Sequence, residues 1–164
     1  MLLPRLKIRN IKSSLILENS LNISGIFPIN SCIVTIYKNS RNLVNVTKLK
    51  SFSELYKICE ILEKKFRAII KTIRIDSIML SRKCSNKRFS LKKMLEVCKR
   101  FQNELRLNFN VELFHAPWIS SQFGSFNLFT TGSVTVLGVK KVEHISIIQN
   151  FLDKVYSFEN EITK

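Results

Sequence analysis

The chain has 164 residues, 45% of them hydrophobic, which is enough for one packed domain or two small repeats. Its 27 Lys and Arg residues against 12 Asp and Glu give a formal net charge of +15, so we expect a polyanionic partner, with a solvated lysine-rich surface as the alternative. The sequence shows neither an uncharged apolar run of about 18 residues nor a secretory leader pattern, which predicts a soluble intracellular protein without a membrane partner.

The four cysteines, Cys32, Cys59, Cys84 and Cys98, are widely spaced and form no C-x-x-C pair. We interpret them as reduced, mostly buried thiols. The sequence has two histidines, no nucleophile motif and no glycine-rich phosphate loop, and its acidic residues do not cluster. It therefore predicts a protein with no cofactor, no metal, no small-molecule substrate and no enzymatic activity.

The first half of the chain is predicted to be mostly β-structure. Apolar and polar residues alternate over 6–17, 22–27, 31–38 and 42–49, a pattern typical of half-buried strands. A helix is predicted over 51–66, because Leu55, Cys59 and Leu62 fall on one face and Ser51 with Glu54 forms a capping box.

The second half repeats this alternation of strands and helices. Strands are predicted over 72–81 and 109–115, followed by a hairpin whose tight turn, 130–133, uses the conformational freedom of Gly132. Amphipathic helices are predicted over 90–105, with Ser90 as its cap, and over 142–158.

A hairpin, a lysine-containing segment after it and a helix occur in this order twice, which predicts two repeats, 1–71 and 72–164. Helices that are apolar on one side only suggest an α+β fold, in which one curved antiparallel sheet carries the helices on its convex face. The other face of the sheet would be an open apolar surface, so we expect a partner to cover it.

One segment of the second repeat resembles a known family. The stretch from Phe129 to Lys140, FTTGSVTVLGVK, is similar without a gap to the F-S-S-G-K-x-V-x-T-G-A-K signature of the TATA-box-binding protein family. Further similar segments are I-R-N-I at 8–11, Y-K-N-S-R at 37–41, T-K-L-K-S at 47–51 and E-L-F at 112–114. The short, lysine-rich chain resembles the divergent versions encoded by large DNA viruses.

The resemblance implies a saddle of two pseudo-symmetric repeats that sits on the minor groove of DNA. Only residues 18–25 separate the first two predicted strands, so the first repeat is expected to be reduced and to lack its first helix. By the resemblance, the aromatic wedges that open base steps would be Phe114 and Phe129, with Phe27 and Tyr37 in the first repeat. Groove or phosphate contacts would come from Asn10 as the central amide and from Lys38, Arg41, Val44, Val46, Thr131, Val134 and Val136.

The resemblance implies a transcription initiation factor that binds and bends AT-rich promoter DNA. Its helices would meet a IIB-like initiation factor and RNA polymerase, in a host nucleus or in a cytoplasmic viral factory. Two alternatives remain: a TBP-fold interaction subunit of a transcription complex with weak or no sequence-specific DNA binding, and an accessory domain of an enzyme. Two departures from the family pattern count against TATA specificity: Ser133 replaces a lysine, and Asp76 would repel phosphate.

Overall fold

The computed structural model describes residues 5–83, 88–110 and 117–163. Contacts divide the chain into two compact units. The N-terminal unit comprises residues 8–78, and the C-terminal unit comprises the chain from residue 79 onward together with residues 5–7. The division falls inside strand β5 (Ile70–Arg82), so this strand contributes to both units, and it lies a few residues after the predicted boundary at 71/72.

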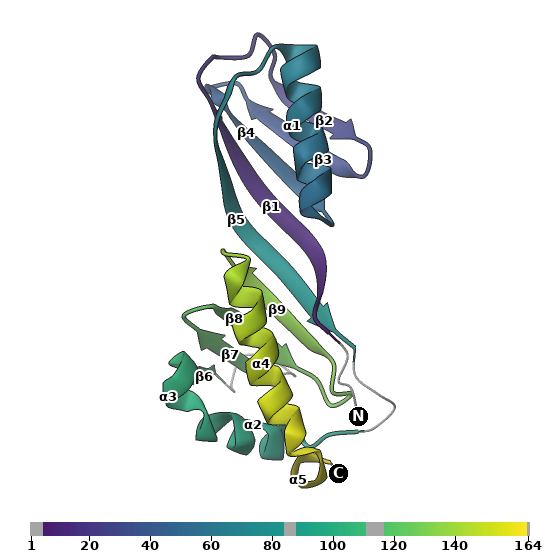
Figure 1. The fold of residues 1–164 in the computed structure, drawn as a ribbon, viewed down its shortest axis with the longest axis vertical. Coiled ribbons are helices and arrows are strands. Elements are labelled where there is room, and N and C mark those ends of the chain that lie inside the picture. The colour runs from purple at the N-terminus through teal and green to yellow at the C-terminus, as the bar shows by residue number, and fades with distance from the viewer. Residues whose placement is uncertain (1–4, 84–87, 111–116, 164) are drawn as a thin grey trace. The chain divides into compact units, whose positions relative to one another are not determined.

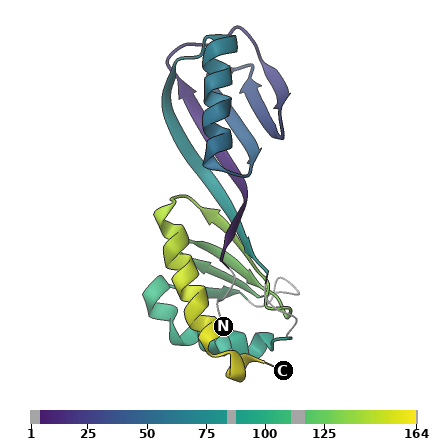
Figure 2. The same ribbon diagram turned by 45° about the vertical axis from the view of Figure 1, so that its right-hand side comes forward.

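The N-terminal unit is a sheet with one helix. Its strands are β1 (Lys7–Leu17), β2 (Gly25–Ile29), β3 (Cys32–Tyr37) and β4 (Ser40–Leu49), and its helix is α1 (Phe52–Phe66). The strand order is β2-β3-β4-β1-β5, and α1 lies across one face of these strands (Figures 1 and 2). Ser51 caps α1 by accepting a hydrogen bond from the Glu54 amide at 3.2 Å, as the sequence predicts.

The two faces of this sheet differ in burial. Val34, Ile36, Val44 and Val46 are almost fully buried and form the core with Leu55, Ile58 and Leu62 of α1. The residues that alternate with them in the strands are partly exposed, and they lie on the face opposite α1, which we call the open face of this unit. The open face includes the partly exposed Thr35, Asn45 and Thr47, together with Ser14 of β1, which is only 3% exposed.

The C-terminal unit has the same layering with more helices. Its elements are α2 (Leu91–Arg100), α3 (Gln102–Leu105), β6 (Asn108–Asn110), β7 (Trp118–Ser121), β8 (Gly124–Leu128), β9 (Val134–Val139), α4 (Glu143–Ser157) and α5 (Glu159–Ile162). The strand order is β5-β9-β8-β7-β6. Phe126 of β8 packs against Phe151 of α4, with ring centres 5.5 Å apart, so this face of the sheet belongs to the helices. The opposite face is the open face of the C-terminal unit.

Two features of the fold bear on the predicted repeats. Residues 18–24, which the structure describes completely, form no helix between β1 and β2, so the first repeat is reduced as predicted. The helix predicted over 90–105 is divided into α2 and α3 at Phe101, whose φ and ψ angles are −104° and 12°. The ring of Phe101 is 6.3 Å from that of Phe151 and 6.2 Å from that of Phe158, and this packing accompanies the break.

Strands β2 and β6 end the strand order. Strand β2 pairs with β3 on one side, and it contains Pro28 opposite Ile33. The observed strand, Gly25–Ile29, begins three residues after the strand predicted over 22–27 and ends two residues after it.

The described cysteines are buried free thiols, as predicted for Cys32, Cys59 and Cys98, while Cys84 lies outside the described residues. Burial raises the pKa of the Cys59 thiol to about 11 and that of Cys98 to about 12. Among the described residues, no helix is both long enough and apolar enough to cross a membrane. The α+β fold class, with an antiparallel sheet and helices on one face, is confirmed.

Candidate nucleic-acid interface

The open face of the C-terminal unit is an uncharged surface. Cross-strand pairs place Ser125 opposite Leu137 and Asn127 opposite Thr135, and all four side chains are partly exposed. Within the described bounds of β6 to β9, no residue is charged. The surface therefore offers methyl groups, two hydroxyls and an amide, but no ion that a close partner would have to desolvate.

Four valines predicted to face a groove are instead core residues, so this part of the prediction is wrong. Val134 and Val136 are at most 1% exposed beneath α4, and Val44 and Val46 are fully buried beneath α1. The predicted set is displaced by one residue, which exchanges the two faces of a strand. The partly exposed residues are Thr135 and Leu137 in β9, and Asn45 and Thr47 in β4.

The signal that could have located these residues was already in the aligned signature. Without a gap, its V and T positions fall on Thr135 and Leu137. In the first half, where the match needs a two-residue insertion before T-K-L-K-S at 47–51, they fall on Asn45 and Thr47. The residue that follows the T position has a positive φ in both halves, 75° at Gly138 and 62° at Lys48. The two units therefore share a positive-φ backbone conformation close to the end of β4 and of β9.

Phe129 is the exposed aromatic residue of the C-terminal unit nearest this face. It follows β8 directly and is 38% exposed, and Gly132 in the next turn donates its backbone N–H to the Phe129 carbonyl at 2.8 Å. The buried Tyr156 hydroxyl donates to the Gly132 carbonyl at 2.6 Å and so fixes the turn to α4. Thr131 is exposed in the same turn. Phe114, the predicted partner of Phe129, lies outside the described residues.

The aromatic pair predicted for the first half is only partly placed on the open face. Phe27 packs against Phe66 of α1, with ring centres 6.2 Å apart, so it faces the helix and the wedge role predicted for it is wrong. Tyr37 is 44% exposed, and its hydroxyl accepts a hydrogen bond from the Asn45 amide at 2.8 Å. Ile26, which sequence reasoning missed, is 70% exposed and pairs with Thr35, which makes it a diagonal neighbour of Tyr37.

Two asparagines have an unpaired amide oxygen. Asn10 in β1 alternates with the buried Ile11, and Asn127 in β8 alternates with the buried Phe126, so each is directed away from the core beneath the helices. Each Oδ1 is buried without a hydrogen-bond partner among the described residues. A buried amide oxygen without a partner is uncommon in folded proteins, so these two asparagines are unusual residues of their strands.

The predicted phosphate contacts, Lys38 and Arg41, are exposed around the turn between β3 and β4. This turn follows Tyr37, so the two cations lie at the same end of the N-terminal unit as the exposed pair of Ile26 and Tyr37. Positive charge at that end of the open face suits contact with a polyanion.

A row of hydrogen-bonded side chains crosses the open face of the N-terminal unit. It runs from Tyr37 on β3 through Asn45 on β4 and Ser14 on β1 to Asp76 on β5, four neighbouring strands. Ser14 Oγ lies 2.9 Å from Asn45 Oδ1 and 2.5 Å from Asp76 Oδ2, and its single proton is donated to the carboxylate. Arg74 Nε donates to Asp76 Oδ1 at 2.8 Å. We call these five residues the polar row. The ion pair with Arg74 offsets the repulsion that the sequence predicts for Asp76.

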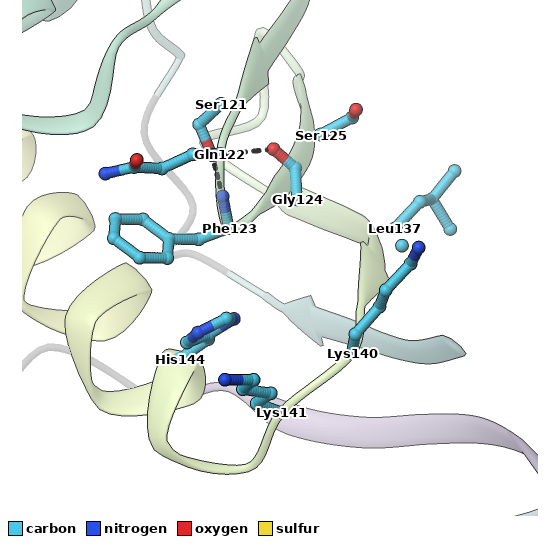
Figure 3. Close-up of a pocket in the computed structure, with 10 residues that line it drawn as sticks. Ser121, Gln122, Phe123, Gly124, Ser125, Leu137, Lys140, Lys141 and His144 are labelled. Carbon is cyan, nitrogen blue, oxygen red and sulfur yellow. Dashed lines mark hydrogen bonds between the residues drawn. The ribbon is translucent and has the colours of Figure 1, made fainter. Parts of the chain in front are cut away.

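A cavity of about 380 Å³ lies beside the turn between β7 and β8 (Figure 3). Its lining includes Lys140, Lys141 and His144, and the His144 ring lies 4.9 Å from the Phe123 ring. Ser121 Oγ holds the turn by accepting from the Phe123 amide at 3.1 Å and donating to the Gly124 carbonyl at 2.7 Å. The lysines give this cavity the charge to receive an anion.

No family model and no curated protein matches the sequence. Among solved structures, a TBP from Methanococcus jannaschii is similar over 94% of this chain and 99% of that chain, with a TM-score of 0.66 and 18% identity. At this identity the likeness shows a common fold. An aspartate kinase from Clostridium acetobutylicum also aligns, over 93% of this chain and 34% of its own at 12% identity, but its TM-score of 0.31 carries no argument.

Proposed function

We propose that this TBP-fold protein binds AT-rich duplex DNA through the minor groove, bends it and acts in transcription initiation. One observation carries the proposal: the uncharged open face of the C-terminal unit, formed around Asn127, Thr135 and Leu137, adjoins the exposed Phe129. The same chain carries a formal net charge of +15, which favours a polyanionic partner.

This surface suits an A·T minor groove for a chemical reason. The floor of that groove presents acceptors and lacks the guanine amino group, so methyl groups of Thr135 and Leu137 can approach closely. The Asn127 amide can donate to an adenine N3 or a thymine O2. An apolar side chain such as Phe129 can enter a base step and kink the duplex, while lysine and arginine side chains neutralise phosphates.

The proposal extends to the role of the protein. The helices of each unit lie on the side away from its open face, which leaves them accessible to a IIB-like initiation factor and RNA polymerase. In this role the chain binds and does not catalyse. We further propose that it is a divergent, virus-type member of the TATA-box-binding protein family that works in a nucleus or a cytoplasmic viral factory.

The test is fluorescence energy transfer across an end-labelled AT-rich duplex and a GC-rich control, titrated with protein at several salt concentrations. The proposal expects the distance between the ends to fall with the AT-rich duplex only. Phe129→Ala should abolish this change while leaving salt-dependent binding within about threefold, because phosphate contacts supply most nonspecific affinity. Tyr56→Ala is the matched control, since Tyr56 is an exposed aromatic residue of α1. Equal bending by wild type and Phe129→Ala would contradict the role of Phe129.

A second candidate is an interaction subunit of a transcription complex without sequence-specific DNA binding. The N-terminal unit favours it, because the polar row puts a carboxylate on the open face and Phe27 faces the helix instead. Equal affinity for the two duplexes without bending would support this second candidate and contradict the first.

A further inference from the structure

The carboxylate of Asp76 is a fixed hydrogen-bond acceptor on the open face of the N-terminal unit. Its side chain is 20% exposed and is held from two sides, by Ser14 at 2.5 Å and by Arg74 at 2.8 Å. A carboxylate has roughly four acceptor sites and no donor, so two sites remain for another partner. Arg74 is 63% exposed, so solvent or a ligand can reach the ion pair.

The neighbours of Asp76 fix its orientation toward this face. Ser14 pairs with Asn45, and Asn45 pairs with Thr35, so these three side chains share the face opposite α1. The hydrogen bond from Asn45 to Tyr37 continues the row to the exposed end of β3. A ligand that covers this face excludes solvent from the remaining acceptor sites of the Asp76 carboxylate, which is costly unless the ligand supplies a hydrogen-bond donor there.

The minor groove contains one group that meets this requirement. A·T and T·A pairs present only acceptors there, which would face the carboxylate unfavourably, whereas a G·C pair adds the N2 amino group as a donor. The C-terminal unit is different, because β6 to β9 carry no charged residue within their described bounds. The open faces of the two units thus have opposite chemical preferences.

We propose that the N-terminal unit selects a base pair with a minor-groove amino group, a G·C pair, through Asp76 in the polar row. The preferred DNA site is then asymmetric, with A·T pairs under the C-terminal unit and at least one G·C pair under the N-terminal unit. This inference rests on the proposed function, since it requires minor-groove binding, and it adds the sequence preference of one half of the site.

Two base substitutions isolate the amino group. Replacing adenine by 2,6-diaminopurine adds the amino group to an A·T pair, and replacing guanine by inosine removes it from a G·C pair, in both cases without altering the groups in the major groove. We would scan the AT-rich duplex one position at a time with diaminopurine and measure affinity and end-to-end distance with the full chain. Any position that gains affinity is then rebuilt as G·C and as I·C.

The expected result is a gain of roughly tenfold in affinity at one or two adjacent positions, the size of a hydrogen bond to a charged acceptor, and losses elsewhere. At the same positions G·C should bind roughly tenfold more tightly than I·C. Asp76→Ala should remove both differences. Glu60→Ala is the matched control, because it deletes an exposed carboxylate of α1 and changes the net charge by the same amount.

The outcomes separate the inference from the proposed function. If the AT-rich duplex is bent but every added amino group weakens binding, the inference is wrong and the proposed function stands. If the gain persists in Asp76→Ala, Asp76 is not the selecting residue and the inference is wrong as stated. If no duplex is bent or preferred, both are overturned. The wild-type scan decides the main point even if Asp76→Ala does not fold.

Discussion

The stability of the C-terminal unit should depend strongly on one partly exposed carboxylate, that of Asp153. Arg82 of β5 is fully buried, and its Nη1 donates to Asp153 at 3.0 Å. Its Nε and Nη2 are buried without a hydrogen-bond partner among the described residues, and the guanidinium carbon lies 4.7 Å from the centre of the Tyr156 ring. Asp153→Asn leaves this buried cation without its counter-charge. Removing one partner of a buried ion pair costs about 3–5 kcal/mol, and we expect about 3 kcal/mol because Asp153 is 42% exposed.

Urea unfolding measures this loss. The one tryptophan of the chain, Trp118, lies in β7 of the same unit, so its fluorescence follows the relevant transition. With an m-value of about 2 kcal/mol per molar, a loss of about 3 kcal/mol lowers the midpoint by about 1.5 M. Adding Arg82→Met to Asp153→Asn should restore most of the lost stability, because the double variant no longer buries a cation without a counter-charge.

The control is the neighbouring ion pair between Lys154 and Glu104, which is 2.7 Å long with both side chains about half exposed. Glu104→Gln should cost less than about 1 kcal/mol, because solvent screens exposed pairs. If Asp153→Asn lowers the midpoint no more than Glu104→Gln does, the buried guanidinium does not depend on Asp153 and the reasoning fails.

Three further predictions concern stability. Tyr156→Phe should cost about 1–3 kcal/mol in thermal unfolding, since it leaves the buried Gly132 carbonyl without its donor at 2.6 Å, and an unchanged melting temperature would contradict this. Gly138 has a φ of 75°, so Gly138→Ala should lower the free energy of unfolding by about 1 kcal/mol. Lys48 has a φ of 62°, so Lys48→Gly should raise it by up to about 1 kcal/mol. If urea unfolding shows changes of the same sign for both variants, the shared conformation is refuted. Burial raises the pKa of Cys98 from 9.0 to about 12, so the thiol ionises first in the unfolded chain. The contribution of this thiol to the free energy of unfolding should therefore fall as pH rises from 9 toward 12, and it should be flat below that range.

Local signals in the sequence predicted several elements well. Ser51 and Glu54 begin α1 as the capping box indicates, and the short segment between β1 and β2 leaves no room for a helix. These features depend on residues close together in the chain, where propensity and capping act directly. The hairpin of β8 and β9 around Gly132 is of the same kind.

The side of each strand that faces the helices was harder to predict. In β9, V-T-V-L-G-V, apolar residues occur on both faces, so alternation alone does not tell Val136 from Leu137. Packing against α4 decides which face is buried, and no local signal in the strand sequence shows that packing. The same ambiguity explains the wrong prediction in β2. Ile26 and Phe27 are adjacent and both apolar, so the sequence did not show that Phe27 faces the helix and Ile26 the open face.

The polar row could not be predicted from spacing at all. Ser14, Asn45 and Asp76 are separated by about thirty residues each, with Ser14 and Asn45 31 apart and Ser14 and Asp76 62 apart. Their contact follows from the pairing of β1 with β4 and the place of β5 beside β1. The sequence alone suggested that the Asp76 carboxylate would repel phosphate. Its partners, Ser14 and Arg74, are brought to it by the assembly of the sheet.

Proline at the free edge of β2 has a consequence for how this protein behaves at high concentration. In the two-residue hairpin that joins β2 to β3, the closing pair of Ile29 and Cys32 is hydrogen-bonded, so by alternation residue 28 directs its backbone nitrogen outward. Pro28 has no N–H to offer there, and an incoming strand finds a gap in the ladder it would need. The edge at β2 is thereby made a poor template for fibres and for strand exchange between copies.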